Sequence, residues 1–245
     1  MKILFKPQTE WLPPEEFKDL SSYDEIAIDL ETKDPNLKTM GSGSVTGQAK
    51  IVGIALAVEG WSAYYPIAHE GGGNMDRKKV MDYFRTILNY PSKKIFHNAM
   101  YDVCFIRAEG LKINGTIVDT MISGSLVDEN RFRYDLGSMG RDYVGRGKNE
   151  AVLLETAKEW GIDPKSEMYK LPAMYVGEYA EQDAKLTLEL WQEMKKEIVH
   201  QDIESIFDLE TSLFPCLVDM RFLGVRVDIE AAHQLKQKLV QEENQ

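Results

Sequence analysis

The 245-residue sequence has no run of about 18 consecutive apolar residues, so we expect no transmembrane helix. Its first residues lack the hydrophobic region of a signal peptide, and we expect none. Cysteine is scarce: Cys104 and Cys216 show neither a zinc-ligand nor a disulfide spacing, which suggests a reducing compartment. We therefore expect both to be ordinary buried thiols.

Basic character is also limited, because 29 Lys and Arg face 40 Asp and Glu, a formal net charge of −11. This balance argues against nonspecific duplex binding, which uses basic surfaces. It does not exclude a nuclease, since a metal site would account for part of the acidity. Residues 131–148 are locally basic, and they form either a solvated loop or a local phosphate contact. Residues 41–47 hold three glycines, but no Gly-Lys-Ser/Thr follows, so a P-loop is not expected.

With 43% hydrophobic residues, the chain can form one sizeable core and a smaller appendage. Strand-like runs come first and then alternate with helix-like runs, which predicts an α/β or α+β fold with a mixed sheet. Residues 33–50 are polar and rich in Gly and Ser, which predicts a flexible loop. Predicted strands are 24–31, 51–58, 62–68, 93–98 and 115–119. Predicted helices are 75–90, 99–109, 120–128, 149–160 and 174–199, and the segment 203–245 fits a helix, a Gly turn and a second helix.

Carboxylates occur in three segments that otherwise look buried. Asp29 and Glu31 are two residues apart on a predicted strand, so they point to the same face. Asp183 follows Tyr179 by four residues and lies on the apolar stripe of a predicted helix. Buried carboxylates are costly unless compensated, and a divalent metal compensates several at once. A solvated acidic edge strand, or an aspartate satisfied by Tyr179 or a backbone group, remains an alternative for each segment alone.

The third segment carries Asp102, early in a predicted helix. The positive end of a helix dipole stabilises a carboxylate there without any metal, so a structural role is also open. The Asn98 side chain is placed to cap the same helix. Asp119 is placed to cap the next helix, and for this residue we favour the structural role.

In chain order the three segments read Asp-x-Glu (29–31), Asn-x-x-x-Asp (98–102) and Tyr-x-x-x-Asp (179–183). This order resembles the three exonuclease motifs of the DEDD superfamily, tyrosine subtype. The resemblance implies a ribonuclease H-like (DnaQ-like exonuclease) fold, a mixed β-sheet flanked by helices, with a short helical C-terminal segment. Among known families it is closest to the 3′→5′ proofreading domain of family A (DNA polymerase I-like) DNA polymerases, of bacteriophage type, over about residues 20–200. Residues 118–121 and 133–136 resemble secondary signatures of that family.

The tail reads Phe-Leu-Gly-Val-Arg-Val-Asp at 222–228 and is similar to the opening of a polymerase domain in the same family. We therefore predict an exonuclease domain over 1–200 and the truncated helical start of a polymerase domain over 201–245. The implied partners are the 3′ end of single-stranded DNA and a polymerase domain of the same longer polypeptide. We expect no membrane partner. Fold analogy predicts a monomer, and the expected location is the cytoplasm, that of the host cell if the chain is viral.

The resemblance implies hydrolysis of the 3′-terminal phosphodiester with two divalent ions, Mg²⁺ or Mn²⁺. By that analogy Asp29, Glu31 and Asp183 hold one ion. Asp29 bridges to the second ion, which Asp102 supports. Tyr179 is a poor base at neutral pH, so the implied role is to orient the attacking water together with Glu31.

The same analogy names substrate contacts. It places Leu30 and Thr32 beside the terminal nucleotide, and Asn98 and Tyr101 near the adjacent base or sugar. Tyr101 would supply stacking, which is tolerant of sequence, and Arg133 would contact phosphate or strand. Core packing for Tyr101 and surface charge for Arg133 remain open.

Three other functions stay open. An RNA-processing 3′→5′ exonuclease would use the same chemistry, although the polymerase-like tail argues against it. A catalytically silent domain that positions DNA is a different class, and the intact acidic set argues against it. A generic acidic α/β domain without a site is the third. The Gly/Ser-rich stretch 41–47 is not a general feature of the family, so it is either a phage-specific loop or an engineered replacement.

Overall fold

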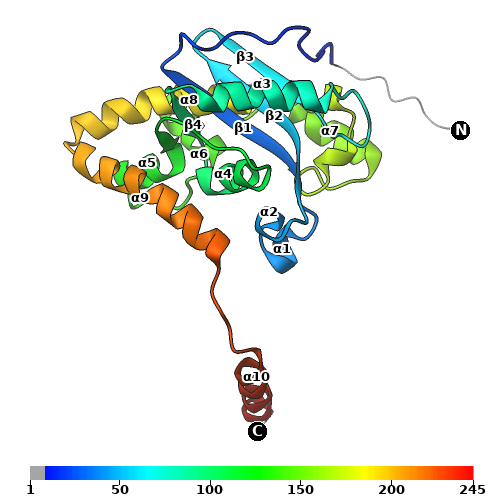
Figure 1. Cartoon of the computed structure of the whole chain (residues 1–245), viewed down its shortest axis with the longest axis vertical. Helices are drawn as coiled ribbons and strands as arrows, with labels where there is room; N and C mark the ends of the chain where they lie inside the picture. The colour runs from blue at the N-terminus through cyan, green and yellow to red at the C-terminus, as the bar shows by residue number, and fades with distance from the viewer. Residues whose placement is uncertain (1–8, 245) are drawn as a thin grey trace, which may run out of the picture.

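The computed structural model describes residues 9–244, so the segment on which the signal-peptide expectation depends lies outside the described residues. Its centre is a five-stranded sheet with the order β3-β2-β1-β4-β5 (Figure 1). The strands β1 (Glu25–Lys33), β2 (Lys50–Val58) and β3 (Trp61–Pro66) form an antiparallel meander. The strands β4 (Lys93–Phe96) and β5 (Ile117–Asp119) run parallel to β1. The predicted mixed sheet is thus confirmed.

Helices cover both faces of this sheet. Side chains of β1 therefore alternate between two separate cores, one on each face. Ile26 and Ile28 lie in a first core, together with apolar side chains of α3 (Arg77–Asn89) and α4 (Ala99–Ala108). Ala27 points the other way, into a second core that α8 (Gly177–His200) dominates. The helices α5 (Thr120–Val127), α6 (Leu136–Met139) and α7 (Ala151–Trp160) also contribute to the second core.

Two segments predicted or left open as loops contain short helices. The stretch after β1 holds α1 (Leu37–Met40) and α2 (Gly43–Thr46), and the Asp34 carboxylate accepts a hydrogen bond from the Gly43 N–H at 3.0 Å. The basic segment holds α6, which the Asp135 side chain caps, and a π-helical turn, Gly140–Val144. Short 3-10 turns cover Met168–Lys170 and Ala173–Tyr175. Elements of three to five residues are too short to show an apolar period.

The C-terminal segment forms the predicted helix, Gly turn and helix. The helix α9 (Glu204–Leu223) packs on the first core through Phe214 and Val218, and Gly224 ends it with a φ of 72°. The helix α10 (Ile229–Glu243) buries no residue and lies away from the body (Figure 1). The domain boundary near residue 200 stays a prediction.

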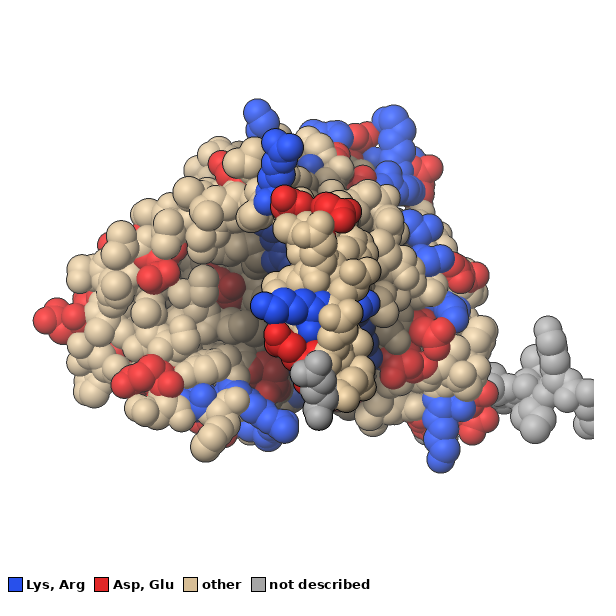
Figure 2. Space-filling model, turned by 90° about the horizontal axis from the view of Figure 1, so that it is seen from below, with Lys and Arg blue, Asp and Glu red and all other residues tan. Residues whose placement is uncertain are grey.

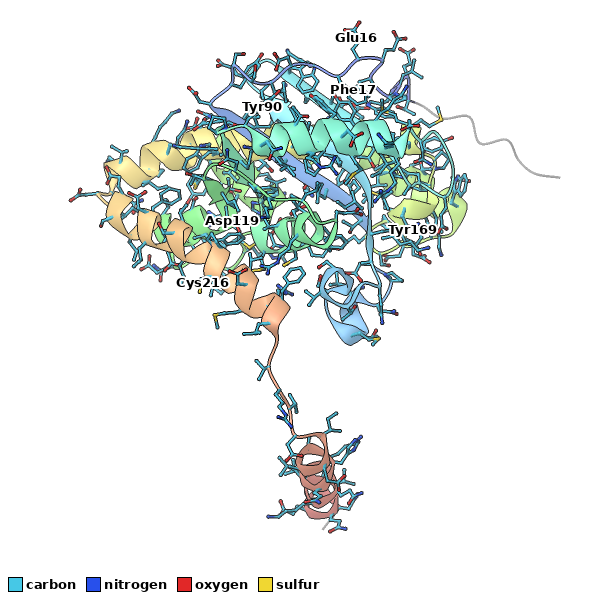
Figure 3. The ribbon with its side chains drawn as sticks, viewed as in Figure 1. Glu16, Phe17, Tyr90, Asp119, Tyr169 and Cys216 are labelled. Carbon is cyan, nitrogen blue, oxygen red and sulfur yellow. The ribbon has the colours of Figure 1, made fainter. Side chains whose placement is uncertain are left out.

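The two cysteines differ. Cys104 is buried in α4, as predicted, but the prediction of a buried thiol is wrong for Cys216. Cys216 lies on α9 and is exposed (Figure 3), because only one narrow stripe of this helix touches the body. Within residues 9–244, no helix combines the length and the apolar character that crossing a membrane requires.

Candidate active site

Strand alternation brings Asp29 and Glu31 to the sheet face that α8 covers. Their neighbours Ile28 and Leu30 point into the first core, so the two carboxylates share the α8 side with Ala27. The pairing of β1 with β2 shifts register between Glu31 and Thr32, and such bulges often lie beside active sites. The predicted same-face placement of both carboxylates is confirmed, and a solvated edge strand is excluded because β1 is the central strand.

The α8 side chain Asp183 belongs to the same electrostatic group. Burial, and then the nearby Asp183 carboxylate, raise the pKa of Asp29 to about 7. Burial raises the pKa of Glu31 well above its ordinary value, and Asp29 and Asp183 add to this effect. Both shifts have the sign expected when like charges are held together out of water. A cation placed among these groups would reverse the penalty.

Asp102 reaches the same group from α4. Its Oδ1 atom accepts a hydrogen bond from the Leu30 N–H at 3.0 Å. That N–H lies beyond Ala27, the last β1 residue that pairs with β4, so the carboxylate takes the place of a missing strand partner. Burial, and then Asp29, raise the pKa of Asp102 well above its ordinary value. Asp102 does lie in the first turn of its helix, but its carboxylate also joins α4 to the acidic strand.

The N-terminus of α4 is held by Asp119 and not by Asn98. Asn98 takes a left-handed conformation with a φ of 63°, and its side chain makes no cap hydrogen bond, so that expectation was wrong. Instead the Asp119 carboxylate accepts from the N–H groups of Asn98 and Ala99, at 2.9 and 2.8 Å, and from Met121 N–H at 2.9 Å. The predicted cap of α5 is therefore confirmed. The same carboxylate also fixes the helix that carries Asp102.

Sequence reasoning missed Lys148, which follows the π-helical turn. Its ammonium lies 2.5 Å from Asp183 Oδ2 and 2.9 Å from the Tyr179 hydroxyl. Burial raises the pKa of Asp183, and the charge of Lys148 opposes that rise. Burial, and then Asp183, raise the pKa of Tyr179 well above its ordinary value. The residue was noted only as part of a basic segment, and no local pattern marks it as a partner of α8.

The five predicted substrate-contact residues differ in whether the structure places them near the carboxylates. Leu30 is buried in the first core, and the hydroxyls of Thr32 and Tyr101 lie 2.7 Å apart beside the acidic strand. Asn98 is exposed at the start of α4. Arg133 is exposed in the loop before α6. The structure therefore brings Leu30, Thr32 and Tyr101 to the carboxylates through β1 and α4, but it shows no contact of Arg133 with them.

The carboxylates offer the hard oxygen donors that Mg²⁺ and Mn²⁺ accept. In the part of the chain that the structure describes, no three His, Cys, Asp or Glu side chains stand in ligating geometry. A buried, unpartnered donor is present, because Asp183 Oδ1 has no hydrogen-bond partner. Asp29, Glu31, Asp102 and this oxygen fit divalent cations by chemistry and charge, provided that the side chains draw together around them.

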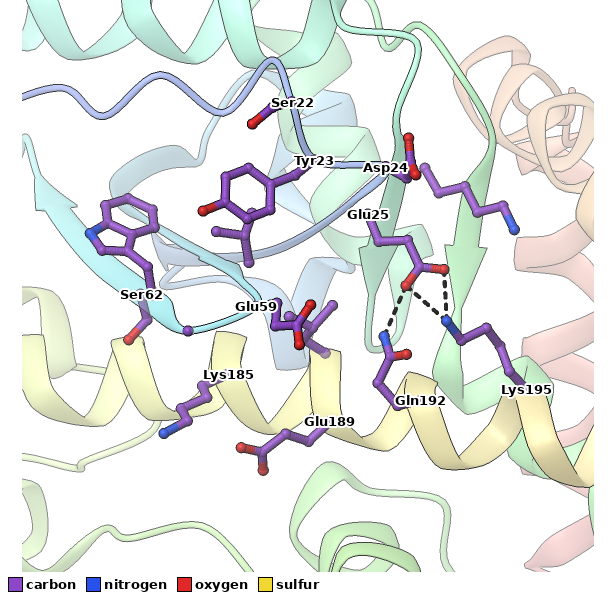
Figure 4. Close-up of a pocket in the computed structure, with 15 residues that line it drawn as sticks. Ser22, Tyr23, Asp24, Glu25, Glu59, Ser62, Lys185, Glu189, Gln192 and Lys195 are labelled. Carbon is purple, nitrogen blue, oxygen red and sulfur yellow. Dashed lines mark hydrogen bonds and ion pairs between the residues drawn. The ribbon is translucent and has the colours of Figure 1, made fainter.

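A cavity of about 910 Å³ lies at the opposite end of β1. Glu25 lines it and binds Gln192 and Lys195, as the dashed lines in Figure 4 show. Glu25 is four residues from Asp29, or about 13 Å along a strand. This cavity is therefore separate from the carboxylates. On the face seen in Figure 2, acidic and basic side chains are interspersed, and most of that surface is neither.

Comparison with known proteins decides the family. Residues 6–199 match the model of a protein family described as 3′-5′ exonuclease. The chain belongs to this exonuclease family. It is 33% identical over 245 residues to a DNA-directed DNA polymerase of Pseudomonas phage M6. The alignment covers 97% of the chain but only 37% of that relative, so the chain spans little more than a third of it.

Two solved structures show the same fold at low identity. NrnC of Brucella melitensis with bound Mg²⁺ has a TM-score of 0.59 and 14% identity, and the match covers 84% of this chain and 89% of that one. RNase D of Escherichia coli, described as an exoribonuclease involved in structured RNA processing, has a TM-score of 0.55 and 18% identity. That match covers 87% of this chain and 50% of RNase D. The exonuclease fold inferred from the three motifs is confirmed.

Proposed function

We propose that the chain is a metal-dependent 3′→5′ exodeoxyribonuclease. It removes the terminal nucleotide of single-stranded or frayed DNA and proofreads for a family A polymerase domain of the same longer polypeptide. The observation that carries this proposal is the convergence of Asp29, Glu31, Asp102 and Asp183 from two helices and the central strand. Such a group of repelling charges is costly to maintain in the absence of cations.

Asp29, Glu31 and Asp183 would hold one divalent ion, and Asp29 with Asp102 a second. When bound, the ions supply charge stabilisation to the phosphodiester and lower the pKa of the attacking water. The protein contributes the positions. The Leu30 N–H holds one oxygen of Asp102, and the two-residue spacing on β1 keeps Asp29 and Glu31 on one face.

Tyr179 acts as a hydrogen-bond donor in this scheme. Its raised pKa keeps the phenol protonated at neutral pH, so it does not take a proton from water. A protonated hydroxyl that faces the carboxylates can orient the attacking water by donating to its oxygen, and Glu31 accepts a hydrogen of that water. Thr32 and Tyr101, joined through their hydroxyls, form the adjacent wall against which a terminal sugar or base would lie.

Selectivity for DNA ends follows from strandedness. Mismatched ends fray more readily, and an unpaired strand stacks on aromatic side chains without regard to sequence. RNA is the second candidate substrate, because RNase D shares the fold. The phage polymerase relative supports DNA and a polymerase partner, and with them a cytoplasmic location.

A direct test incubates the chain with 5′-labelled single-stranded DNA or RNA of one sequence, with Mg²⁺, Mn²⁺ or chelator. We expect a ladder that shortens from the 3′ end of the DNA and disappears with chelator. A faster ladder on RNA would favour the RNA-processing alternative. Absence of cleavage by folded protein, together with absence of Mn²⁺ binding in calorimetry, would leave the silent DNA-positioning domain.

A further inference from the structure

The surroundings of Lys148 are more specific than charge neutralisation requires. The ammonium touches two groups at once, Asp183 Oδ2 at 2.5 Å and the Tyr179 hydroxyl at 2.9 Å, and it lies 5.0 Å from the centre of the Tyr179 ring. Only 26% of the side chain is exposed. Its stem passes over α6, where a Cβ atom on Gly137 would lie 3.5 Å from Lys148 Cγ.

The contact with Tyr179 sets the direction of the phenol. An ammonium group has three donors and no acceptor, so the Tyr179 oxygen accepts from Lys148. The hydroxyl hydrogen is then left for an acceptor on another side. Burial, the charges of Asp183, Glu31 and Asp29, and a hydrogen bond with Asp183 all raise the pKa of the Tyr179 hydroxyl, so its hydrogen lies on the acidic side. A water bound among those carboxylates would take this hydrogen bond in place of Asp183.

The contact with Lys148 gives the two carboxylate oxygens of Asp183 different roles. Oδ2 is paired with Lys148, while the buried Oδ1 has no partner. A carboxylate fixed through one oxygen keeps its rotamer, and the free oxygen points to one place. Lys148 does not need to leave for a cation to bind at Oδ1.

We propose that Lys148 is a positioning residue of the exonuclease reaction, which directs the Tyr179 hydroxyl toward the attacking water and fixes Asp183 through one oxygen. The inference rests on the proposed function, since it assigns a role within the same site. A competing explanation is that Lys148 only neutralises the acidic group in the metal-free protein. The two explanations differ in turnover, because a mere counter-ion is dispensable once cations are bound.

The test compares Lys148→Met, Lys148→Arg and Tyr179→Phe with the double variant Lys148→Met/Tyr179→Phe. Lys195→Met is the matched control: Lys195 is 34% exposed and pairs with Glu25 at 2.9 Å, at the far end of the sheet. Turnover on single-stranded DNA is measured at saturating Mn²⁺. The Mn²⁺ dissociation constant is measured separately by calorimetry, and folding by circular dichroism.

For Lys148→Met we expect turnover to fall roughly 10- to 100-fold, less than the roughly 100- to 1,000-fold cost of losing a donor that itself contacts the reacting group, because Lys148 acts through Tyr179. Mn²⁺ binding should be unchanged or tighter, because a competing positive charge is gone. Lys148→Arg should recover part of the turnover, and Lys195→Met should match wild type. Turnover of the double variant should be less than about threefold below that of the less active single variant, Lys148→Met or Tyr179→Phe. The two losses overlap because Lys148 acts largely through Tyr179.

Two results would overturn the proposal. If turnover of Lys148→Met stays within about threefold of wild type, Lys148 is only a counter-ion. If the loss of turnover in the double variant is the product of the two single losses, Lys148 does not act through Tyr179. If wild-type protein binds Mn²⁺ but cleaves no DNA, the proposed function fails. In that case the Mn²⁺ dissociation constant still tests the contact of Lys148 with Asp183. Weaker Mn²⁺ binding by Lys148→Met would contradict the proposal, which expects unchanged or tighter binding.

Discussion

Replacing Asp29 with asparagine should stabilise the metal-free protein at neutral and alkaline pH. Burial and Asp183 raise the pKa of Asp29 from 3.8 to about 7. Each unit of a raised carboxyl pKa destabilises the folded state by about 1.4 kcal/mol above both pKa values, so three units set an upper bound of about 4 kcal/mol. Asp29 keeps partial solvent contact, and Lys148 offsets part of the repulsion. We therefore expect a gain of about 1–3 kcal/mol.

The pH dependence separates this effect from general changes in packing. The penalty on wild type is fully present above a pH of about 7, shrinks as the pH falls toward 3.8, and vanishes below 3.8. Urea unfolding with chelator at pH 8 and pH 5 should therefore show a larger gain for Asp29→Asn at pH 8. Saturating Mn²⁺ at pH 8 should reduce or reverse the gain, because wild type binds the ion more tightly.

Asp208→Asn provides the control, since Asp208 is an exposed aspartate on α9, outside the group of Asp29, Glu31, Asp102 and Asp183. It should change the free energy of unfolding by less than about 0.5 kcal/mol at either pH. The reasoning is refuted if Asp29→Asn is less stable than wild type at pH 8 in chelator. A gain that is equal at pH 8 and pH 5 would also refute it, because packing and not charge would then be the cause.

Three further predictions concern single side chains. Asp183→Ala should abolish metal-dependent cleavage in the ladder assay, whereas Tyr179→Phe should lose much less, because the carboxylates remain. Asp119→Ala removes the acceptor of three backbone N–H groups, so urea unfolding should show a loss of about 2–4 kcal/mol. In Gly53→Ala the new Cβ atom would lie 2.0 Å from the Tyr64 hydroxyl, so a loss of about 1–3 kcal/mol is expected in thermal unfolding, and an unchanged melting temperature would contradict it.

The spacing of residues along single strands and helices predicted much of the candidate site from the sequence. A spacing of two on a strand and of four on a helix placed Asp29 with Glu31, and Tyr179 with Asp183, because each pair belongs to one regular element. Asp119 was recognised as a cap for the same reason, since Met121 N–H is two residues away. Its bonds to Asn98 and Ala99 join two parallel strand ends, and no local pattern encodes them.

Lys148 shows the limit of sequence reasoning in this chain. It reaches α8 from the loop between the π-helical turn and α7, a segment with no apolar period to predict. Segment 131–148 has five Lys and Arg residues. Arg131 pairs with Asp142, Arg146 with Glu189 and Lys148 with Asp183, so three of the five form ion pairs within the protein. Only the fold separates Lys148 from these neighbours. The same segment was therefore open between a solvated loop and a phosphate contact; it contains α6 and the π-helical turn, and the phosphate contact stays a prediction.

The metal-free site is held together by hydrogen bonds from backbone N–H groups to its carboxylates, although the charge of Asp119 adds to the repulsion on Asp102. The Leu30 N–H holds Asp102, and Asp119 holds the helix that carries it. Asp29 and Asp183 lie on β1 and α8, which pack against each other through the second core. The fold can thus keep the carboxylates close before any cation arrives, at a cost in free energy that Asp29→Asn should recover. A variant that is more stable but inactive is the expected signature of a site organised for cation binding.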